Sequence, residues 1–389
     1  MYKIKLLNEI SNVIYQQLSA DDYMVTKDEN EPDAILVRSA AMHDMPLPSS
    51  LLAIARAGAG VNNIPLDKCA KEGIVVFNTP GANANAVAEL VMCGLLLASR
   101  NVIGGIEWAR TLDGQDGVAK LVEKGKGQFV GPELRGKKLG VIGLGAVGAI
   151  AANTAAQGFG MDVVGYDPYI SVENAWSLSR AIHRSDNLET LLSTCDYITI
   201  HVPLTDKTKH MFNHGTFARM KTGAALLNYS RAELVDNESL REALDSKKLR
   251  AYVTDFPNEE TLKIPGAICI PHIGASTPES EDNCASAAAA EIRDYLECGS
   301  IVHSVNMPDM PLDPPAGYRL FVIHDNVPNM ISLITSKVGE AGINILNMRN
   351  GSRKDMAITV LEMEQEPTND VIENIKTQDG VIRVRLFHR

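Results

Sequence analysis

Short, almost continuous apolar runs recur through the first three quarters of the chain, and helix-like stretches lie between most of them. Alternation of such strands with helices is typical of parallel sheets that are covered by helices on both faces. The pattern therefore predicts an α/β architecture. The predicted strands are residues 34–39, 52–58, 74–79, 138–145, 162–167, 197–202, 225–230, 251–256 and 267–272.

The pattern changes toward the C-terminus. An alanine-rich stretch at 278–299 predicts one long helix, and a proline-rich connector at 306–317 predicts a domain boundary. After the connector, strand-like and helix-like segments follow in the order βαββαβ, which is the order of a ferredoxin-like domain. A module of this size often pairs with a second copy to cover its sheet.

A glycine-rich turn stands between a predicted strand and a predicted helix. The sequence GLGAVG at 143–148 follows the strand-like KLGVI, and Asp167 ends the next strand. Glycines here let the backbone approach a pyrophosphate at a helix N-terminus, while the carboxylate accepts hydrogen bonds from the adenosine ribose. Because a carboxylate repels a 2′-phosphate, the motif favours NAD; the alternative is a tight turn without a ligand. The predicted ligands are Gly143, Gly145, Ala146, Val147, Gly148 and Asp167.

The position of this motif predicts a discontinuous first domain. About 100 residues of other α/β pattern precede it, although a nucleotide-binding motif often opens a chain. A nucleotide-binding domain inserted into a flanking domain explains this order. We expect a substrate-binding domain at 1–97 and 281–306, a Rossmann-like NAD-binding domain at 98–280, and a third domain at 317–389.

Composition narrows the function classes. The chain has 389 residues and a formal net charge of −11, which argues against a nucleic-acid surface and gives no membrane signal. The most apolar helix, near 86–98, is interrupted by Glu89 and is too short to span a bilayer. The charged, strand-like first residues do not resemble a signal peptide. Six scattered cysteines without a C-x-x-C pair predict no metal site and no disulfide framework, and favour the reducing cytoplasm.

Seven sequence blocks resemble, in order, those of the D-2-hydroxyacid dehydrogenases. The resemblance spans about 300 residues and implies a Rossmann-like NAD domain inserted in a flavodoxin-like α/β substrate domain. The tail, IHDNVPN at 323–329 and AGINI at 341–345, resembles an ACT regulatory domain. Within the family, this combination is most similar to the short-form D-3-phosphoglycerate dehydrogenases. The seven blocks lie at 56–67, 78–90, 143–148, 166–168, 201–205, 228–236 and 271–277.

Three side chains could assist the oxidation of a secondary alcohol by NAD. His272, in the PHIGAST loop after the last strand of the series, has an imidazole suited to acid/base work near neutral pH. Arg231 follows another strand, and a guanidinium matches a carboxylate and can polarise the adjacent carbonyl. A carboxylate would orient His272. The family's D-x-x-x-x-E spacing from Asp255 implies Glu260, with Glu259 as the alternative. The competing interpretation of His272 is a structural loop histidine, and that of Arg231 is a surface ion pair.

The resemblance implies further ligands at other strand ends. Arginines of the flanking domain bind the substrate phosphate in the family, although an interface ion pair is the alternative for Arg38. A glycine loop presents N–H groups to a carboxylate, and the ends of the Rossmann strands contact the cofactor. The implied substrate ligands are Arg38, Arg56, Gly58, Gly60, Val61 and Asn78, and the implied further NAD ligands are His201, Pro203, Asp255 and Gly274.

Two places depart from the family pattern. In NYSRAELVD at 228–236, Ala232 stands where glycine is usual, and Tyr229 with Ser230 where smaller residues are common. We expect this change to narrow the space beside the nicotinamide without removing a reacting group. In the tail, Asn329 replaces the usual glycine after Pro328. The resemblance implies that serine binds between paired modules; the alternative is an ACT fold kept for assembly. The implied effector ligands are His324, Asn326 and Asn344.

The residues and the resemblance together predict a function. We expect NAD-dependent oxidation of 3-phospho-D-glycerate to 3-phosphohydroxypyruvate, the first step of the phosphorylated route to L-serine, by a homo-oligomer (dimer or tetramer). The alternatives are another D-2-hydroxyacid dehydrogenase, such as a hydroxypyruvate or glyoxylate reductase, and an NAD-sensing partner-binding protein. The arginines of the flanking domain and the ACT-like tail favour the phosphorylated substrate.

Overall fold

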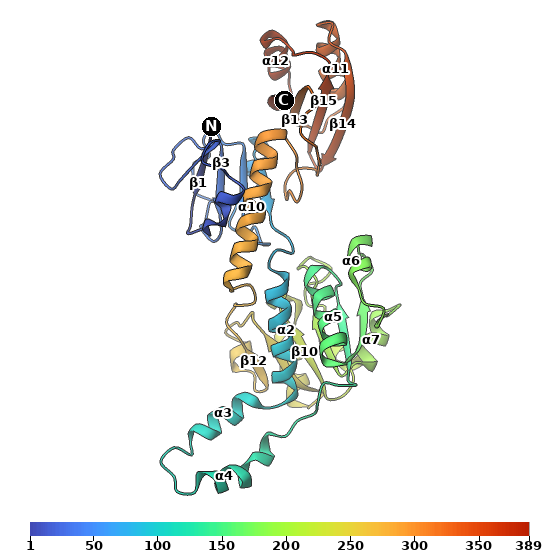
Figure 1. The fold of residues 1–389 in the computed structure, drawn as a ribbon. Helices are drawn as coiled ribbons and strands as arrows, with labels where there is room; N and C mark the ends of the chain where they lie inside the picture. The colour runs from blue at the N-terminus through green and yellow to red at the C-terminus, as the bar shows by residue number, and fades with distance from the viewer. Residues whose placement is uncertain (389) are drawn as a thin grey trace. The chain divides into compact units, whose positions relative to one another are not determined.

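The computed structural model describes residues 1–388, which form two compact units (Figure 1). The first combines Met1–Asn83 with Pro278–Arg389, and the second is Ala84–Thr277. The sequence pattern placed these boundaries at 97/98 and 280/281. The first boundary lies earlier because helix α2 (Ala84–Ser99) packs in the second unit, where Val87, Val91 and Leu95 share a core with Leu139 and Leu227.

The first unit contains a five-stranded parallel sheet. Its strands are β1 (Tyr2–Leu6), β2 (Tyr23–Thr26), β3 (Ala34–Val37), β4 (Ala53–Arg56) and β5 (Val75–Asn78), in the order β2-β1-β3-β4-β5. That is the flavodoxin-like order. Short helices η1 (Asn12–Gln16) and α1 (Leu66–Lys71) belong to its connections, and the long helix α10 (Pro278–Cys298) packs on β3, β4 and β5. The predicted α/β class is confirmed for this unit.

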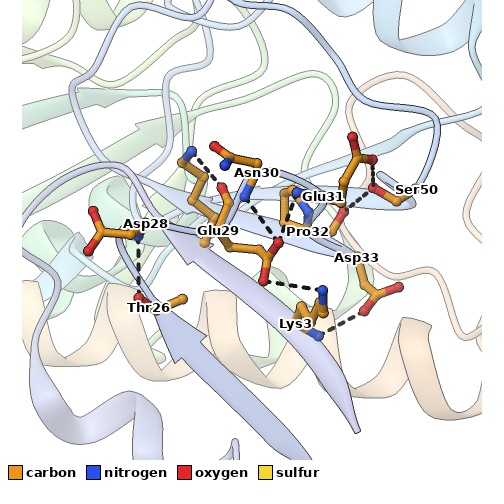
Figure 2. Close-up of polar contacts among 10 residues, drawn as sticks. Lys3, Thr26, Asp28, Glu29, Asn30, Glu31, Pro32, Asp33 and Ser50 are labelled. Carbon is orange, nitrogen blue, oxygen red and sulfur yellow. Dashed lines mark hydrogen bonds and ion pairs between the residues drawn. The ribbon is translucent and has the colours of Figure 1, made fainter.

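The connection from β2 to β3 must pass β1, and a carboxylate holds its turn together. Glu29 accepts hydrogen bonds from the backbone N–H groups of Asn30 and Glu31 and forms an ion pair with Lys3 of β1 (Figure 2). Those backbone bonds, with Lys3, hold the pKa of Glu29 below its usual value. Asp33 then receives the backbone N–H of Lys3 at 2.8 Å, so the turn is tied to the strand that it crosses.

The second unit contains a seven-stranded parallel sheet in the order β12-β11-β10-β9-β6-β7-β8. The strand order reverses between β6 and β9, which is the switch point where nucleotides bind in Rossmann-like folds. Helix α2 covers one face together with α5. The strands are β6 (Lys138–Ile142), β7 (Asp162–Tyr166), β8 (Ile182–Arg184), β9 (Tyr197–Ile200), β10 (Ala224–Asn228), β11 (Leu249–Thr254) and β12 (Ala267–Cys269). The helices are α5 (Ala146–Phe159), α6 (Val172–Ser177), α7 (Leu188–Thr194), α8 (His214–Arg219), η3 (Ala232–Leu234), α9 (Asn237–Asp245) and η4 (Thr261–Lys263).

Within this unit, residues 101–130 extend away from the sheet as an arm (Figure 1). The arm contains α3 (Val102–Arg110), α4 (Val118–Gly125) and η2 (Lys126–Phe129), and none of their side chains is buried. Trp108 packs on Phe129, with ring centroids 5.3 Å apart. Within residues 1–388 no single helix is long and apolar enough to cross a membrane, and α2 with α3 reach that composition only as a pair bent by 68°.

The C-terminal segment adds a βαββαβ module to the first unit. Its elements follow the βαββαβ order that the sequence pattern predicted, and its antiparallel sheet has the strand order β14-β15-β13-β16. Helices α11 and α12 cover one face, and apolar side chains of the other face, including Phe321 and Phe387, share a core with Tyr295 of α10. The elements are β13 (Tyr318–Asp325), α11 (Met330–Glu340), β14 (Ile345–Arg353), β15 (Met356–Met363), α12 (Asn369–Lys376) and β16 (Val381–His388).

Candidate functional site

The glycine turn after β6 has the geometry of a nucleotide site. Gly143 has a φ of +89°, and a Cβ there would stand 2.4 Å from the carbonyl oxygen of His201. A Cβ on Gly148 would stand 1.9 Å from the carbonyl oxygen of Gly143. At Gly145, which caps α5 without a side chain, a Cβ would meet nothing within 4 Å. Two glycines are therefore required by the fold, and the third leaves open space at the start of α5, next to Ala146 and Val147, where a pyrophosphate would fit.

Asp167 lies against this turn. One carboxylate oxygen accepts the backbone N–H of Leu144 at 2.8 Å, and the other accepts that of Tyr169 at 2.8 Å. These bonds fix the carboxylate at the end of β7, directly beside the glycine turn. Each oxygen keeps a further lone pair for a ribose hydroxyl.

His201 closes β9 on the other side of the switch point. Its Nε2 lies 2.9 Å from the hydroxyl of Thr199, and burial lowers its pKa to about 4. The ring is therefore neutral at physiological pH, which does not suit it to work as an acid or base there. Pro203 follows on the exposed loop.

Arg231 and His272 come together around an aromatic ring. The guanidinium of Arg231 lies 5.4 Å from the ring centroid of Phe256, and the ring of His272 lies 4.3 Å from that of Phe256. Nη1 of Arg231 donates to the carbonyl of Ser230 at 2.7 Å, and the buried amide of Asn228 donates to the carbonyl of Arg231 at 2.8 Å. Arg231 and His272 are exposed. The two groups thus share one face of the unit and keep donors available.

A buried carboxylate lies behind this pair. Asp255 is only 2% exposed; its Oδ2 accepts the backbone N–H of Gly274 at 3.2 Å. Its Oδ1 is buried without a hydrogen-bond partner within residues 1–388. Burial raises the pKa of Asp255, while electrostatic interaction with the nearby His272 and Arg231 acts against that rise. An unsatisfied buried acceptor calls for a donor, and the carboxamide of a nicotinamide supplies one.

Glu260 does not reach His272 in this arrangement. Its carboxylate accepts from the side-chain amide of Asn237 at 2.8 Å, and it stands exposed before η4. Glu259 is also exposed. Within residues 1–388, the carboxylate with the clearest electrostatic contact to His272 is Asp255. The choice between Glu260 and Glu259 stays a prediction.

Sequence reasoning missed Phe256, Asn228 and the place of Tyr229. Phe256 follows Asp255 at the end of the predicted strand 251–256, so its position beside a candidate ligand was a usable signal. Tyr229 is 6% exposed and turns into the core, where a Cβ on Gly94 of α2 would stand 2.2 Å from its hydroxyl. The larger residue at 229 therefore takes up space against α2.

The candidate phosphate ligands lie together in the first unit. Arg38 follows β3, while Arg56 and Asn78 end β4 and β5 and are paired in register. Nη2 of Arg38 forms an ion pair with Glu281 of α10 at 2.7 Å, and Nε of Arg56 donates to the carbonyl of Arg38 at 3.1 Å. This arrangement puts two guanidinium groups at one sheet edge.

The glycine loop after β4 supports the same edge. The N–H of Gly58 donates to the hydroxyl of Thr79 at 2.8 Å, and a Cβ on Gly58 would stand 2.3 Å from Nη1 of Arg56. Asn78 donates to the carbonyl of Ala59 at 2.6 Å. Gly60 and Val61 follow in this half-buried loop. The glycine at 58 thus makes room for the guanidinium.

A single C-terminal module does not bring the three candidate effector residues together. His324 is 2% exposed, and its ring nitrogens lie 2.8 Å from the carbonyl of Asp325 and 2.9 Å from the hydroxyl of Thr359. Asn326 follows β13, whereas Asn344 precedes β14, whose first residue is level with the opposite end of β13. A site that uses both asparagines therefore needs a second copy.

Comparisons with known proteins find relatives over most of the chain. A family model described as "D-isomer specific 2-hydroxyacid dehydrogenase, NAD binding domain" matches residues 94–274. The chain is 33% identical over 356 residues to the D-3-phosphoglycerate dehydrogenase of Haemophilus influenzae, covering 87% of this chain and 82% of that one. The D-3-phosphoglycerate dehydrogenase of Methanocaldococcus jannaschii is also 33% identical, over 88% of this chain and 64% of that protein. The solved structure of the NAD⁺-bound 3-phosphoglycerate dehydrogenase of Entamoeba histolytica matches with a TM-score of 0.59 and 27% identity, over 78% of this chain and 98% of that one.

Proposed function

This chain belongs to the D-isomer specific 2-hydroxyacid dehydrogenases, and we propose that it uses NAD to oxidise 3-phospho-D-glycerate to 3-phosphohydroxypyruvate. The observation that carries the proposal is the group formed by Arg231, Phe256 and His272 beside the buried Asp255. The similarity to several D-3-phosphoglycerate dehydrogenases supports the phosphorylated substrate and a place at the entry to serine synthesis.

The proposed reaction needs a proton acceptor and an anchor for the substrate carboxylate. When bound, NAD supplies the hydride acceptor for the hydrogen on C2. His272 takes the proton of the C2 hydroxyl, because an exposed imidazole is a base near neutral pH. Arg231 holds the carboxylate and polarises the carbonyl that forms, and Asn228 fixes the backbone that carries it. Glu260 is proposed to support His272 after reorientation of its side chain.

The cofactor is proposed to bind along the strand ends of the second unit. Asp167 accepts from the ribose, the turn at 143–148 receives the pyrophosphate, and Asp255 accepts from the carboxamide through Oδ1. His201 and Pro203 border the adenine side, and Gly274 keeps its backbone close to the nicotinamide. In the first unit, Arg38, Arg56 and Asn78 are proposed to bind the phosphate end, and the loop at 58–61 to contact the carboxylate.

A substrate panel tests this function. The protein is assayed with NAD⁺ and 3-phosphoglycerate, and with NADH and 3-phosphohydroxypyruvate, hydroxypyruvate or glyoxylate. We expect the highest kcat/KM with the phosphorylated acids. A clear preference for unphosphorylated acids would replace the substrate and keep the reaction class, and no turnover with any of them would favour an NAD-sensing binding protein.

We propose that the enzyme is a cytoplasmic homo-oligomer. The arm formed by residues 101–130 exposes Ile103, Ile106 and Val118, and a pocket of about 540 Å³ at its base is lined by α3 and β12. Apolar surface of this kind marks a place for another chain. All six cysteines are free thiols, which suits a reducing compartment. Sedimentation of the full chain, compared with a variant carrying Ile103→Ser and Ile106→Ser, tests the oligomer.

The C-terminal module is proposed to be an ACT domain that binds serine between two copies. The support is its βαββαβ order and the separation of Asn326 from Asn344 within one copy. Activity measured across a serine titration decides between regulation and a purely structural module. A flat response would remove the feedback hypothesis.

A further inference from the structure

Arg38, one of the candidate phosphate ligands, is already paired with a carboxylate of the first unit. Glu281 stands in the first turn of α10, and its Oε1 lies 2.7 Å from Nη2 of Arg38 at the end of β3. Both side chains are partly open to solvent, at 43% for Glu281 and 36% for Arg38. The ion pair is therefore formed within the first unit, at the edge where an anionic substrate group is expected.

A second guanidinium group lies next to Arg38. Arg56 approaches from the neighbouring strand and donates to the carbonyl of Arg38 at 3.1 Å. The backbone of Arg38 is held in turn, because its N–H donates to the side-chain oxygen of Asn8 at 3.1 Å. Two guanidinium groups thus lie next to each other at this edge, and the backbone of Arg38 is held in place.

We propose that Glu281 is a built-in competitor for the phosphate of the substrate: it pairs with Arg38 in the free enzyme, and the phosphate displaces it. The proposal rests on the function proposed above and assigns to Glu281 a positioning role that tunes specificity. The exchange needs no covalent step; it replaces one carboxylate with one phosphate at the same guanidinium. The carboxylate raises the apparent KM for phosphorylated substrates and keeps Arg38 in place between turnovers.

The physical features of the pair permit such an exchange. A partly exposed ion pair is weak because solvent screens it, so a phosphate carrying about two charges can compete for the arginine. Glu281 also has a second source of stabilisation when Arg38 leaves, since a carboxylate in the first turn of a helix interacts favourably with the helix dipole. The released side chain remains hydrated, so no charge is stranded in the core.

The test compares Glu281→Gln with Asp282→Asn in the full-length enzyme. Asp282 is the next residue of α10, and its carboxylate accepts from the hydroxyl of Ser11, so this control removes the same charge without touching Arg38. Glu281→Gln is expected to lower KM for 3-phosphoglycerate by about two- to fivefold, the range of a surface ion pair, with the change in KM rather than in kcat. KM for hydroxypyruvate, which has no phosphate, and KM for NAD⁺ are expected to stay unchanged, and Asp282→Asn is expected to behave as the wild type.

Several results would overturn the proposal. An unchanged or higher KM for 3-phosphoglycerate in Glu281→Gln would mean that Glu281 is neutral or helps to orient Arg38. An equal fall in both variants would show a general charge effect. If the wild type fails to oxidise 3-phosphoglycerate, the proposed function fails by itself, and calorimetric titration with inorganic phosphate then decides. Tighter phosphate binding by Glu281→Gln than by the wild type and Asp282→Asn supports the competition, and equal binding removes it.

Discussion

The carboxyl edges of the two parallel sheets carry the same kinds of side chain, but they balance their charges differently. At the edge of the first sheet, Arg38 is paired with Glu281 at 2.7 Å. At the edge of the second, Arg231 has no ion pair within residues 1–388 and instead bonds to the carbonyl of Ser230 and lies near the ring of Phe256. An arginine that is already paired, such as Arg38, can exchange one anion for another. Arg231 at the second edge can instead bind an anionic substrate without displacing a carboxylate.

The buried carboxylates of the two units sharpen this difference. Glu291 of α10 and Asp255 after β11 each have one oxygen without a partner within residues 1–388, and burial raises the pKa of both. At Asp255, His272 and Arg231 counteract the rise, but at Glu291 the nearby charge of Asp294 adds to it. A cluster of cations around a buried acceptor is typical of a functional site, whereas the pair of Glu291 with His303 has the character of a structural contact.

The largest effect is expected from Arg231. Replacing it with lysine keeps the charge but loses the planar fork that binds a carboxylate through two hydrogen bonds. We expect kcat/KM for the substrate to fall by about 10²–10³-fold, as for the loss of one preorganised donor. Steady-state kinetics measure it, with Arg241→Lys on the exposed side of α9 as a control that is expected to match the wild type. A fall of less than fivefold would show that a single cationic charge is enough at this edge.

A smaller effect is expected at Asp255. Its Oδ1 is the unsatisfied acceptor proposed for the nicotinamide carboxamide, and an asparagine would place a donor at one of the two oxygen positions. We expect Asp255→Asn to raise KM for NAD⁺ by about tenfold, equivalent to one hydrogen bond to a charged group. Titration of the full chain with NADH, followed by fluorescence, gives the affinity directly. Unchanged NADH affinity would leave Asp255 as a partner of His272 alone.

A substitution at the carboxyl edge of the first sheet is expected to have a weaker effect, and one that is selective for the phosphorylated substrate. Arg56→Ala should raise KM for 3-phosphoglycerate by about tenfold, because one charge-assisted hydrogen bond to phosphate is lost. KM for hydroxypyruvate should change little, since that acid has no phosphate. The melting temperature must be measured in parallel because Arg56 also supports the carbonyl of Arg38. An unchanged KM for 3-phosphoglycerate would remove the phosphate assignment from this edge.

The sequence predicts those parts of the site that depend on local geometry. The turn at 143–148 is recognisable because Gly143 and Gly148 leave no room for a side chain. The placement of Arg231 and His272 also follows, since both come directly after apolar strands and parallel strands end at one edge. The alternation of strands and helices similarly predicts the two parallel sheets, and the change of pattern after residue 317 predicts the βαββαβ module, which packs in the first unit.

Other parts depend on packing between distant residues. Helix α2 is apolar on most sides, so its pattern does not reveal that it packs with Leu139 and Leu227 of the second unit. The ion pair of Arg38 with Glu281 joins the two sequence segments that make up the first unit. The contact of Phe256 with His272 depends on how two loops fold back at one sheet edge. No periodicity in the sequence records such contacts.

The smallest effect is expected at Glu291, as a pH-dependent change in the stability of the folded protein. Burial raises the pKa of Glu291 to about 9, and its Oε1 lies 3.0 Å from Nδ1 of His303. Because the folded pKa lies above the unfolded value, the stability that the protonated group contributes is complete below about pH 4.3 and is lost as pH rises toward 9.

A glutamine at position 291 cannot ionise and still offers a donor to His303. Relative to the wild type, Glu291→Gln should therefore gain melting temperature steadily between pH 5 and 9, by about 2–4 °C for each kcal/mol of relieved ionisation. Glu340→Gln, which removes an exposed carboxylate near Lys337, should show no such trend. If Glu291→Gln runs parallel to the wild type across this range, Glu291 is ionised in the folded protein and forms a charged pair with His303.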